Sequence, residues 1–269
     1  MDLQNYVLIV LGKNNMDKII FFDIDGTLAV RGEIPESNLK ALKLLKDKSH
    51  KTFICTGRAP FYAKKLFGHL VDGIVCCNGR YILYQNKKLH GEAFSRDELR
   101  TYLDLLDKNN LGALLVSDDC SMAYHLSDEE IEQAKKEYGK TRIQPYDDKI
   151  TVYTLDIYYR DRERYLNMVN VFKENLVIND HSGIGNCDCS TIGFDKGDGI
   201  AYILKYFKIS KNDAYAFGDG ENDRAMFREV NHGIAMGNAV DSLKNVATYI
   251  TDNVDQEGIT KALKHEKLI

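Results

Sequence analysis

The chain has 269 residues and a formal net charge of −4, with 44% hydrophobic residues, 28% charged residues and only three prolines. A chain of this length can bury a large core and is near the size at which chains divide into domains. The slightly negative charge argues against broad binding to nucleic acids or anionic membranes, and the low proline content argues against a linker-rich, disordered chain.

The N-terminal segment precedes the first convincing strand. It contains the apolar run VLIVL, which is too short to span a membrane and has no basic flank typical of a signal peptide. Met16 stands immediately before the first strand pattern. We therefore predict that residues 1–15 are a dispensable N-terminal extension.

Six short apolar runs predict buried strands of a parallel sheet. In chain order they are IIFF, TFIC, GIVCC, AYAF, GIAM and ATYI. Helical patterns lie between them: one opens at Ile34-Pro35, and another has apolar residues at positions 200, 203, 204 and 207. Strands that alternate with helices predict an α/β fold with a doubly wound parallel sheet.

The middle of the chain breaks this alternation. Strand-like segments (YILYQ, ALLVS, VYTLDIYY) mix there with helical patterns around residues 97–109, 128–138 and 161–174. The last stretch, HSGIGNCDCSTIGFDKG, is rich in Gly, Asp and Ser and predicts a loop or an edge strand. We predict an α+β domain at 81–189, inserted into a core domain made of 16–80 and 190–269.

Polar residues follow the predicted core strands at the point where each strand ends. They are Asp23 and Asp25, then Thr56, Gly57 and Arg58, then Asn78 and Gly79, and finally residues 218–223 with Asp219, Asn222 and Asp223. Ligands bind at the carboxyl ends of parallel strands, so at least three carboxylates should share one site. Such a group of like charges requires a cation, and hard oxygen ligands favour Mg²⁺. Each acidic segment alone could be an ordinary turn, but the two together favour the cation site.

Other site types do not fit the sequence. An EF-hand loop starting at Asp219 would need Gly where Arg224 stands and Glu where Val230 stands. GIGNCD has Asp188 in place of the third glycine of a dinucleotide site, and neither GxxxxGK[ST] nor GxSxG occurs. The six cysteines form no CxxC pair, which favours reduced structural thiols in a cytoplasmic protein.

Four segments resemble the motifs of the haloacid dehalogenase superfamily: DIDGT, CTGR, GFDKG and GDGEND. Further stretches, IPESNLKALKLLKDK, NGR and GIAMGNA, are similar to the Cof-type phosphatases. The resemblance covers residues 16–80 and 190–269. It implies a Rossmann-like core with an inserted α/β cap domain.

The resemblance also implies roles for individual residues. Asp23 matches the nucleophile that becomes an aspartyl phosphate, and Asp25 matches the general acid and base. The implied Mg²⁺ ligands are the side chains of Asp23 and Asp219 and the backbone carbonyl of Asp25, with Asp223 acting directly or through water. The implied phosphate contacts are Thr56, Gly57, Lys196 and Asn222.

Lys196 has a second argument, because it begins the helix predicted around residues 200–207. Exposed amides and the helix dipole favour an anion there, and an ammonium group would offset the transferring phosphate. The alternative is an exposed surface lysine. Arg58 could contact phosphate or form a structural salt bridge, and the loop around Gly183, Ile184 and Gly185 is the first part of the cap to inspect for substrate contacts.

The sequence as a whole predicts a Mg²⁺-dependent phosphatase that hydrolyses small phosphorylated metabolites, sugar phosphates foremost, through an aspartyl phosphate. One alternative is a phosphomutase or phosphotransferase acting on sugar phosphates, and another is a non-catalytic protein that senses metabolites. The expected partner is a small phosphorylated metabolite rather than nucleic acid or membrane. We expect a cytoplasmic monomer or homodimer.

Overall fold

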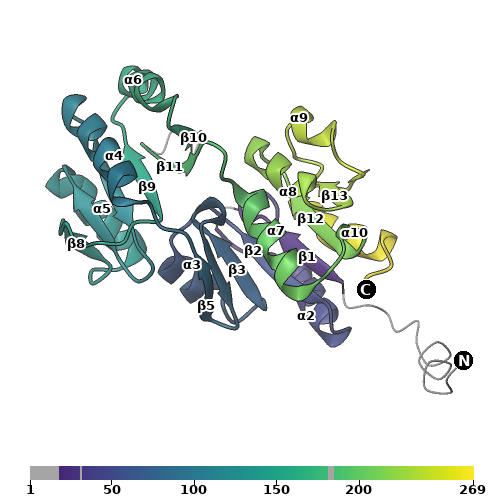
Figure 1. Cartoon of the computed structure of the whole chain (residues 1–269). Coiled ribbons are helices and arrows are strands. Elements are labelled where there is room, and N and C mark those ends of the chain that lie inside the picture. Colours follow the sequence, from purple (N-terminus) through teal and green to yellow (C-terminus); the bar gives the residue numbers. More distant parts are fainter. Residues whose placement is uncertain (1–17, 31, 181–184) are drawn as a thin grey trace, which may run out of the picture. The chain divides into compact units, whose positions relative to one another are not determined.

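The computed structural model describes residues 18–30, 32–180 and 185–269 (Figure 1). The predicted extension at 1–15, and Gly183 and Ile184 of the predicted cap loop, lie outside the described residues. The chain forms two compact units. Unit 1 contains the residues up to Phe53 and those from Ala201 onward, and unit 2 contains Ile54–Ile200.

Unit 1 contains four parallel strands in the order β14-β13-β12-β1. Their bounds are β1 (Ile19–Phe22), β12 (Ala214–Gly218), β13 (His232–Ala235) and β14 (Tyr249–Ile250). Strand β2 (Lys51–Cys55) contains the division between the units, and its Lys51 amide donates to the Lys18 carbonyl at 2.9 Å. These five strands overlap with five of the six predicted apolar runs, and the sixth run, GIVCC, contains β3 (Gly73–Cys76).

Helices and short 3₁₀ turns connect or follow the strands of unit 1. They are α2 (Glu36–Asp47), η2 (Lys211–Asp213), η3 (Glu221–Asp223), α8 (Arg224–Arg228), α9 (Asp241–Lys244), η4 (Val254–Gln256) and α10 (Gly258–His265). Helix α7 (Lys196–Phe207) contains the second division point. The strand residues of β1 are fully buried, and the rings of Phe22 and Phe217 stack at 5.0 Å, so the core of unit 1 lies along β1 and β12.

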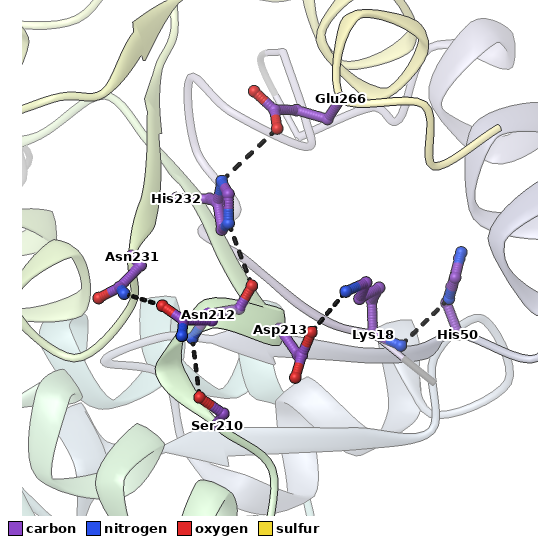
Figure 2. A network of polar contacts seen from close by, with 8 residues as sticks. All are labelled: Lys18, His50, Ser210, Asn212, Asp213, Asn231, His232 and Glu266. Atoms are coloured by element: carbon purple, nitrogen blue, oxygen red, sulfur yellow. Dashed lines mark hydrogen bonds and ion pairs between the residues drawn. The ribbon is translucent and has the colours of Figure 1, made fainter. Parts of the chain in front are cut away.

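The amino ends of these strands are joined by a polar network (Figure 2). The Lys18 ammonium pairs with Asp213, and the Lys18 amide donates to His50 Nδ1 at 3.2 Å. The other members are Ser210, Asn212, Asn231, His232 and Glu266. This network fixes the amino ends of the strands. The predicted acidic residues lie at the opposite edge of the sheet, at the carboxyl ends.

The first part of unit 2 contains β3, β4 and β5. Its elements are α3 (Pro60–Phe67), β3 (Gly73–Cys76), η1 (Cys77–Gly79), β4 (Tyr81–Tyr84) and β5 (Lys87–Gly91). Strand β4 is antiparallel to both β3 and β5. The short η1 turn therefore reverses the chain between two hydrogen-bonded strands.

The second part of unit 2 is a six-stranded sheet in the order β10-β11-β9-β6-β7-β8. The strands are β6 (Gly112–Val116), β7 (Ser121–Tyr124), β8 (Ile143–Pro145), β9 (Thr154–Tyr158), β10 (Leu176–Asp180) and β11 (Asn186–Thr191). All neighbours pair antiparallel except β7 and β8. The prediction of a loop or edge strand is wrong for 186–191, because β11 lies between β10 and β9.

Three helices cover this sheet: α4 (Arg96–Lys108), α5 (Asp128–Tyr138) and α6 (Arg162–Phe172). Buried residues of α4 and α6 pack with Leu115, Ile157 and the two β11 cysteines, while α5 packs with Leu114 and Ile143 of neighbouring strands. Helices α4 and α5 each begin with a Ser–Glu capping box. The two sheets confirm the predicted α/β class with an additional α+β part.

No helix within the described ranges has both the length and the apolar composition needed to cross a bilayer.

Candidate active site

The nucleophile candidate, Asp23, lies at the carboxyl end of β1 in unit 1. β1 and β12 are parallel neighbours with Phe22 opposite Phe217, and the Asp23 amide donates to the Phe217 carbonyl at 3.0 Å. Asp219 follows the last residue of β12. Because parallel strands in register end at the same edge, the two carboxylates come from adjacent positions on that edge.

Asp23, Asp219 and Asp223 form an acidic cluster. One carboxylate oxygen from each lies within 4.8 Å of the others; Asp223 is buried and the other two are partly buried. Two full charges 4.8 Å apart repel by about 3.5 kcal/mol at an effective dielectric constant of about 20. A divalent cation removes this repulsion, and a set of carboxylate oxygens suits Mg²⁺. The residues present therefore fit the predicted metal site.

The turn after Asp25 holds Asp219 in position. The hydroxyl of Thr27, which is fully buried, donates to Asp219 Oδ1 at 2.7 Å. Gly26 has a φ of +85°, and a β-carbon there would collide with the Asp219 carboxylate. Asn238 donates to the Gly26 carbonyl at 2.8 Å. The glycine of the DIDGT motif is thus required by both backbone conformation and space.

Asp223 shapes the loop that carries Asp219. Its Oδ2 accepts hydrogen bonds from the amides of Asp219 and Gly220 at 2.9 and 3.0 Å, and the residue is fully buried. This oxygen is already engaged in fixing the backbone, so Asp223 orients the loop in addition to lying within the cluster. Asp25 and Asn222 lie close by in the chain and are exposed.

The predicted phosphate-binding residues Thr56, Gly57 and Lys196 belong to unit 2. Thr56 is buried; its amide donates to the Val75 carbonyl at 2.8 Å, and its hydroxyl accepts from the Arg58 amide at 3.2 Å. A β-carbon on Gly57 would collide with the carboxylate of Asp188. The loop after β2 is therefore held closely on both sides.

Arg58 and Tyr138 lie beside that loop. The Arg58 guanidinium stacks over the ring of Tyr62, 5.5 Å from its centroid, and the Tyr62 ring contacts the ring of Tyr138 edge-on. Burial, together with the nearby Asp156 carboxylate, raises the pKa of Tyr138 well above its usual range. The Tyr138 hydroxyl therefore stays protonated even at a pH at which an ordinary tyrosine ionises.

Lys196 begins α7 and is only 2% exposed, which excludes the alternative of a surface lysine. The predicted free amides at this helix terminus are only partly confirmed. The Gly197 amide donates to Asp195 at 2.9 Å, and the Asp195 amide donates to Asp198 at 2.8 Å. Side-chain carboxylates of the chain itself already cap this terminus, so the helix dipole is a weaker argument for Lys196 than its burial.

The sequence interpretation missed the structural roles of five residues. Asn78 and Asn179 donate to Asp188, while Thr27 and Asn238 support the acidic cluster. Thr27 and Asn238 stand inside segments that carry the family resemblance, which was a usable signal. Asp188 had no such signal, because its partner Asn78 is 110 residues away in the sequence.

Several known proteins are similar to this chain over most of its length. The family model described as haloacid dehalogenase-like hydrolase matches residues 20–263. YkrA of Bacillus subtilis, provisionally named a phosphatase, is 31% identical over 94% of this chain and 98% of its own length. The 5-amino-6-(5-phospho-D-ribitylamino)uracil phosphatase YcsE of the same organism is 27% identical over 92% of this chain and 95% of its own length. The crystal structure of a subclass IIB sugar phosphatase has a TM-score of 0.77 at 27% identity, covering 94% of this chain and all of that one.

Proposed function

This chain belongs to the haloacid dehalogenase-like hydrolases and is a phosphatase, and from that premise we propose that it hydrolyses small phosphorylated metabolites with Mg²⁺. We propose sugar phosphates as the foremost substrates, in line with the names of two similar proteins, a sugar phosphatase and a 5-amino-6-(5-phospho-D-ribitylamino)uracil phosphatase. The observation that carries the proposal is the acidic cluster at the ends of β1 and β12.

In the proposed reaction, a carboxylate oxygen of Asp23 attacks the phosphorus atom in line. The bond from phosphorus to the leaving oxygen breaks, and Asp25 gives that oxygen a proton. Asp25 then accepts a proton from a water molecule that attacks the aspartyl phosphate. Free phosphate leaves, and Asp23 is restored.

Bound Mg²⁺ would offset the negative charge of the phosphoryl group, and Asp23, Asp219 and Asp223 would hold it, together with the backbone carbonyl of Asp25. For Thr56, Gly57, Lys196 and Asn222 we propose contacts to the phosphoryl oxygens. Their match to the family motifs supports this proposal, as does the burial of Thr56 and Lys196. We also propose the inserted cap domain at 81–189, with the core domain formed by 16–80 and 190–269.

The test is phosphate release from a small aryl phosphate with and without Mg²⁺. We expect Asp23→Asn to lower kcat at least about a thousandfold, since the nucleophile is lost, with no fall of the melting temperature in metal-free buffer. Asp47→Asn is the matched control, because Asp47 is an exposed carboxylate at the end of α2. Wild-type turnover in Asp23→Asn would refute the covalent mechanism.

Product analysis separates this function from a phosphomutase or phosphotransferase, which would pass the phosphoryl group to a second substrate without releasing free phosphate. A metabolite sensor would bind phosphorylated compounds without turnover. We propose a cytoplasmic location on the ground that all six cysteines are free and buried. A monomer or a homodimer is equally compatible with the proposed chemistry.

A further inference from the structure

The turn formed by Cys77, Asn78, Gly79 and Arg80 is a junction within unit 2. Its first three residues all have positive φ, at 49°, 49° and 104°. The Asn78 amide donates to the Thr56 carbonyl at 3.1 Å, and the Cys77 amide donates to the Arg58 carbonyl at 3.2 Å. The turn is therefore bonded directly to the loop proposed to bind phosphate.

The Arg80 side chain extends from this turn and is buried, with 7% exposure. Its Nε and Nη2 donate to the Thr191 hydroxyl at 3.2 and 2.6 Å, and its Nη1 donates to the Glu92 carbonyl at 3.0 Å. The guanidinium also lies 4.9 Å from the ring centroids of both Phe94 and Phe194. A planar group with several donors can make all of these contacts at once, and a lysine ammonium cannot.

These partners lie on the two segments that connect the six-stranded sheet to the rest of unit 2. Glu92 and Phe94 lie between β5 and α4, where the chain enters the six-stranded part. Thr191 is the last residue of β11, and Phe194 lies between β11 and α7, where the chain returns. One guanidinium thus contacts both of the segments that connect the six-stranded sheet to the rest of unit 2.

The returning segment leads directly to Lys196. The Phe194 amide donates to the Thr191 carbonyl at 3.1 Å, and a β-carbon on Gly79 would collide with the Asp195 carbonyl oxygen. In the first turn of α7, a β-carbon on Gly199 would lie 3.1 Å from the Gly79 α-carbon. Contacts to the 77–80 turn therefore flank Lys196 on both sides in the sequence.

We propose that Arg80 is a positioning residue for Lys196, acting through Thr191 and the segment that follows it. The proposal rests on the role of Lys196 under the proposed function. A buried ammonium stabilises the charge of the transition state only if it is already in place, so a small shift of residues 191–196 should lower kcat more than it raises KM. Arg80 itself touches no reacting atom in this scheme.

The experiment measures kcat and KM on p-nitrophenyl phosphate, whose small leaving group needs little recognition. We expect Arg80→Lys to lower kcat about 10- to 100-fold with less than about a threefold change in KM. Thr191→Val should lower kcat in the same way, while Thr191→Ser, which keeps the hydroxyl, should stay near the wild type. The double variant Arg80→Lys/Thr191→Val should have a kcat no lower than that of Arg80→Lys alone, because both changes remove the same contact, the one between residues 80 and 191. Arg100→Lys on the exposed face of α4 is the matched control.

Wild-type kcat in folded Arg80→Lys, or fully additive losses in the double variant, would overturn the proposal. If Arg80→Lys does not fold, the Thr191→Val and Thr191→Ser pair decides the question, and equal kcat in the two would also overturn it. Lys196→Met distinguishes the failures. Normal turnover in that variant refutes the assigned role of Lys196, whereas a large loss beside unaffected Arg80→Lys refutes the positioning role alone.

Discussion

Different kinds of interaction position the side chains in the acidic cluster of unit 1 and around the 77–80 turn of unit 2. In unit 1, three carboxylates lie within 4.8 Å of one another and are held there against their mutual repulsion. In unit 2, Thr56 and Lys196 are buried, and close glycine contacts and a network of hydrogen bonds fix their surroundings. The comparison teaches that unit 1 should respond mainly to changes of charge and cation, and unit 2 mainly to changes of shape.

The largest effect should come from neutralising the acidic cluster. We expect Asp219→Asn to lower Mg²⁺-dependent turnover about a thousandfold, since a metal ion contributes several kcal/mol of charge stabilisation to such reactions. In metal-free buffer the same variant should melt at a higher temperature than the wild type, because one repulsive charge is gone. Mg²⁺ should raise the melting temperature of the wild type and hardly that of the variant. If the wild type stays active after complete chelation of Mg²⁺, the acidic cluster of unit 1 does not depend on a cation, and this part of the comparison is wrong.

The sequence predicted unit 1 well because its signals are local. The run IIFF is followed directly by Asp23, the run AYAF is followed after one glycine by Asp219, and both runs form buried strands at the expected positions. Parallel strands in register then bring Asp23 and Asp219 together without any further information. The motif spacing was enough to identify the cluster.

Unit 2 was predicted less well because its order depends on distant partners. The stretch at 186–191 alternates cysteine with polar residues, so one face can pack under α4 and α6 while the other carries Asp188. Read by composition, the same stretch resembles a loop. Contacts with Asn78 and Asn179 explain the buried aspartate in an interior strand. Contacts with Thr191 and the Glu92 carbonyl explain the buried Arg80. These distant partners cannot be identified from one sequence.

A steric change in unit 2 should have an intermediate effect. In Gly57→Ala the new methyl group would meet the Asp188 carboxylate and would lie 3.2 Å from Asn78 Nδ2. Overpacking of this kind costs about 1–3 kcal/mol, which corresponds to about a 10- to 100-fold loss of kcat/KM if the loop shifts. Adding Asp188→Ser to Gly57→Ala should restore part of the activity, because the shorter side chain leaves room. If the losses of activity from Gly57→Ala and Asp188→Ser are purely additive, the contact between these two residues does not determine the position of the loop. Changes of Mg²⁺ concentration should not alter the loss caused by Gly57→Ala.

The smallest effect should come from Thr27, which supports the acidic cluster without belonging to it. Its hydroxyl donates to Asp219 at 2.7 Å from a fully buried position. Thr27→Val keeps the shape and removes the donor, so Asp219 loses an orienting bond and the Mg²⁺ concentration for half-maximal activity should rise about tenfold. Turnover at saturating Mg²⁺ should change little, because the three carboxylates remain.

Thr27→Ser is the matched control for this change, because it keeps the hydroxyl and loses only a methyl group. Mg²⁺ titrations of activity for the two variants give the comparison directly. If Thr27→Val instead lowers turnover equally at every Mg²⁺ concentration, the bond to Asp219 orders the nucleophile loop and not the metal ligand. Unit 1 would then itself contain a part whose activity responds to changes of shape and a part whose activity responds to changes of charge.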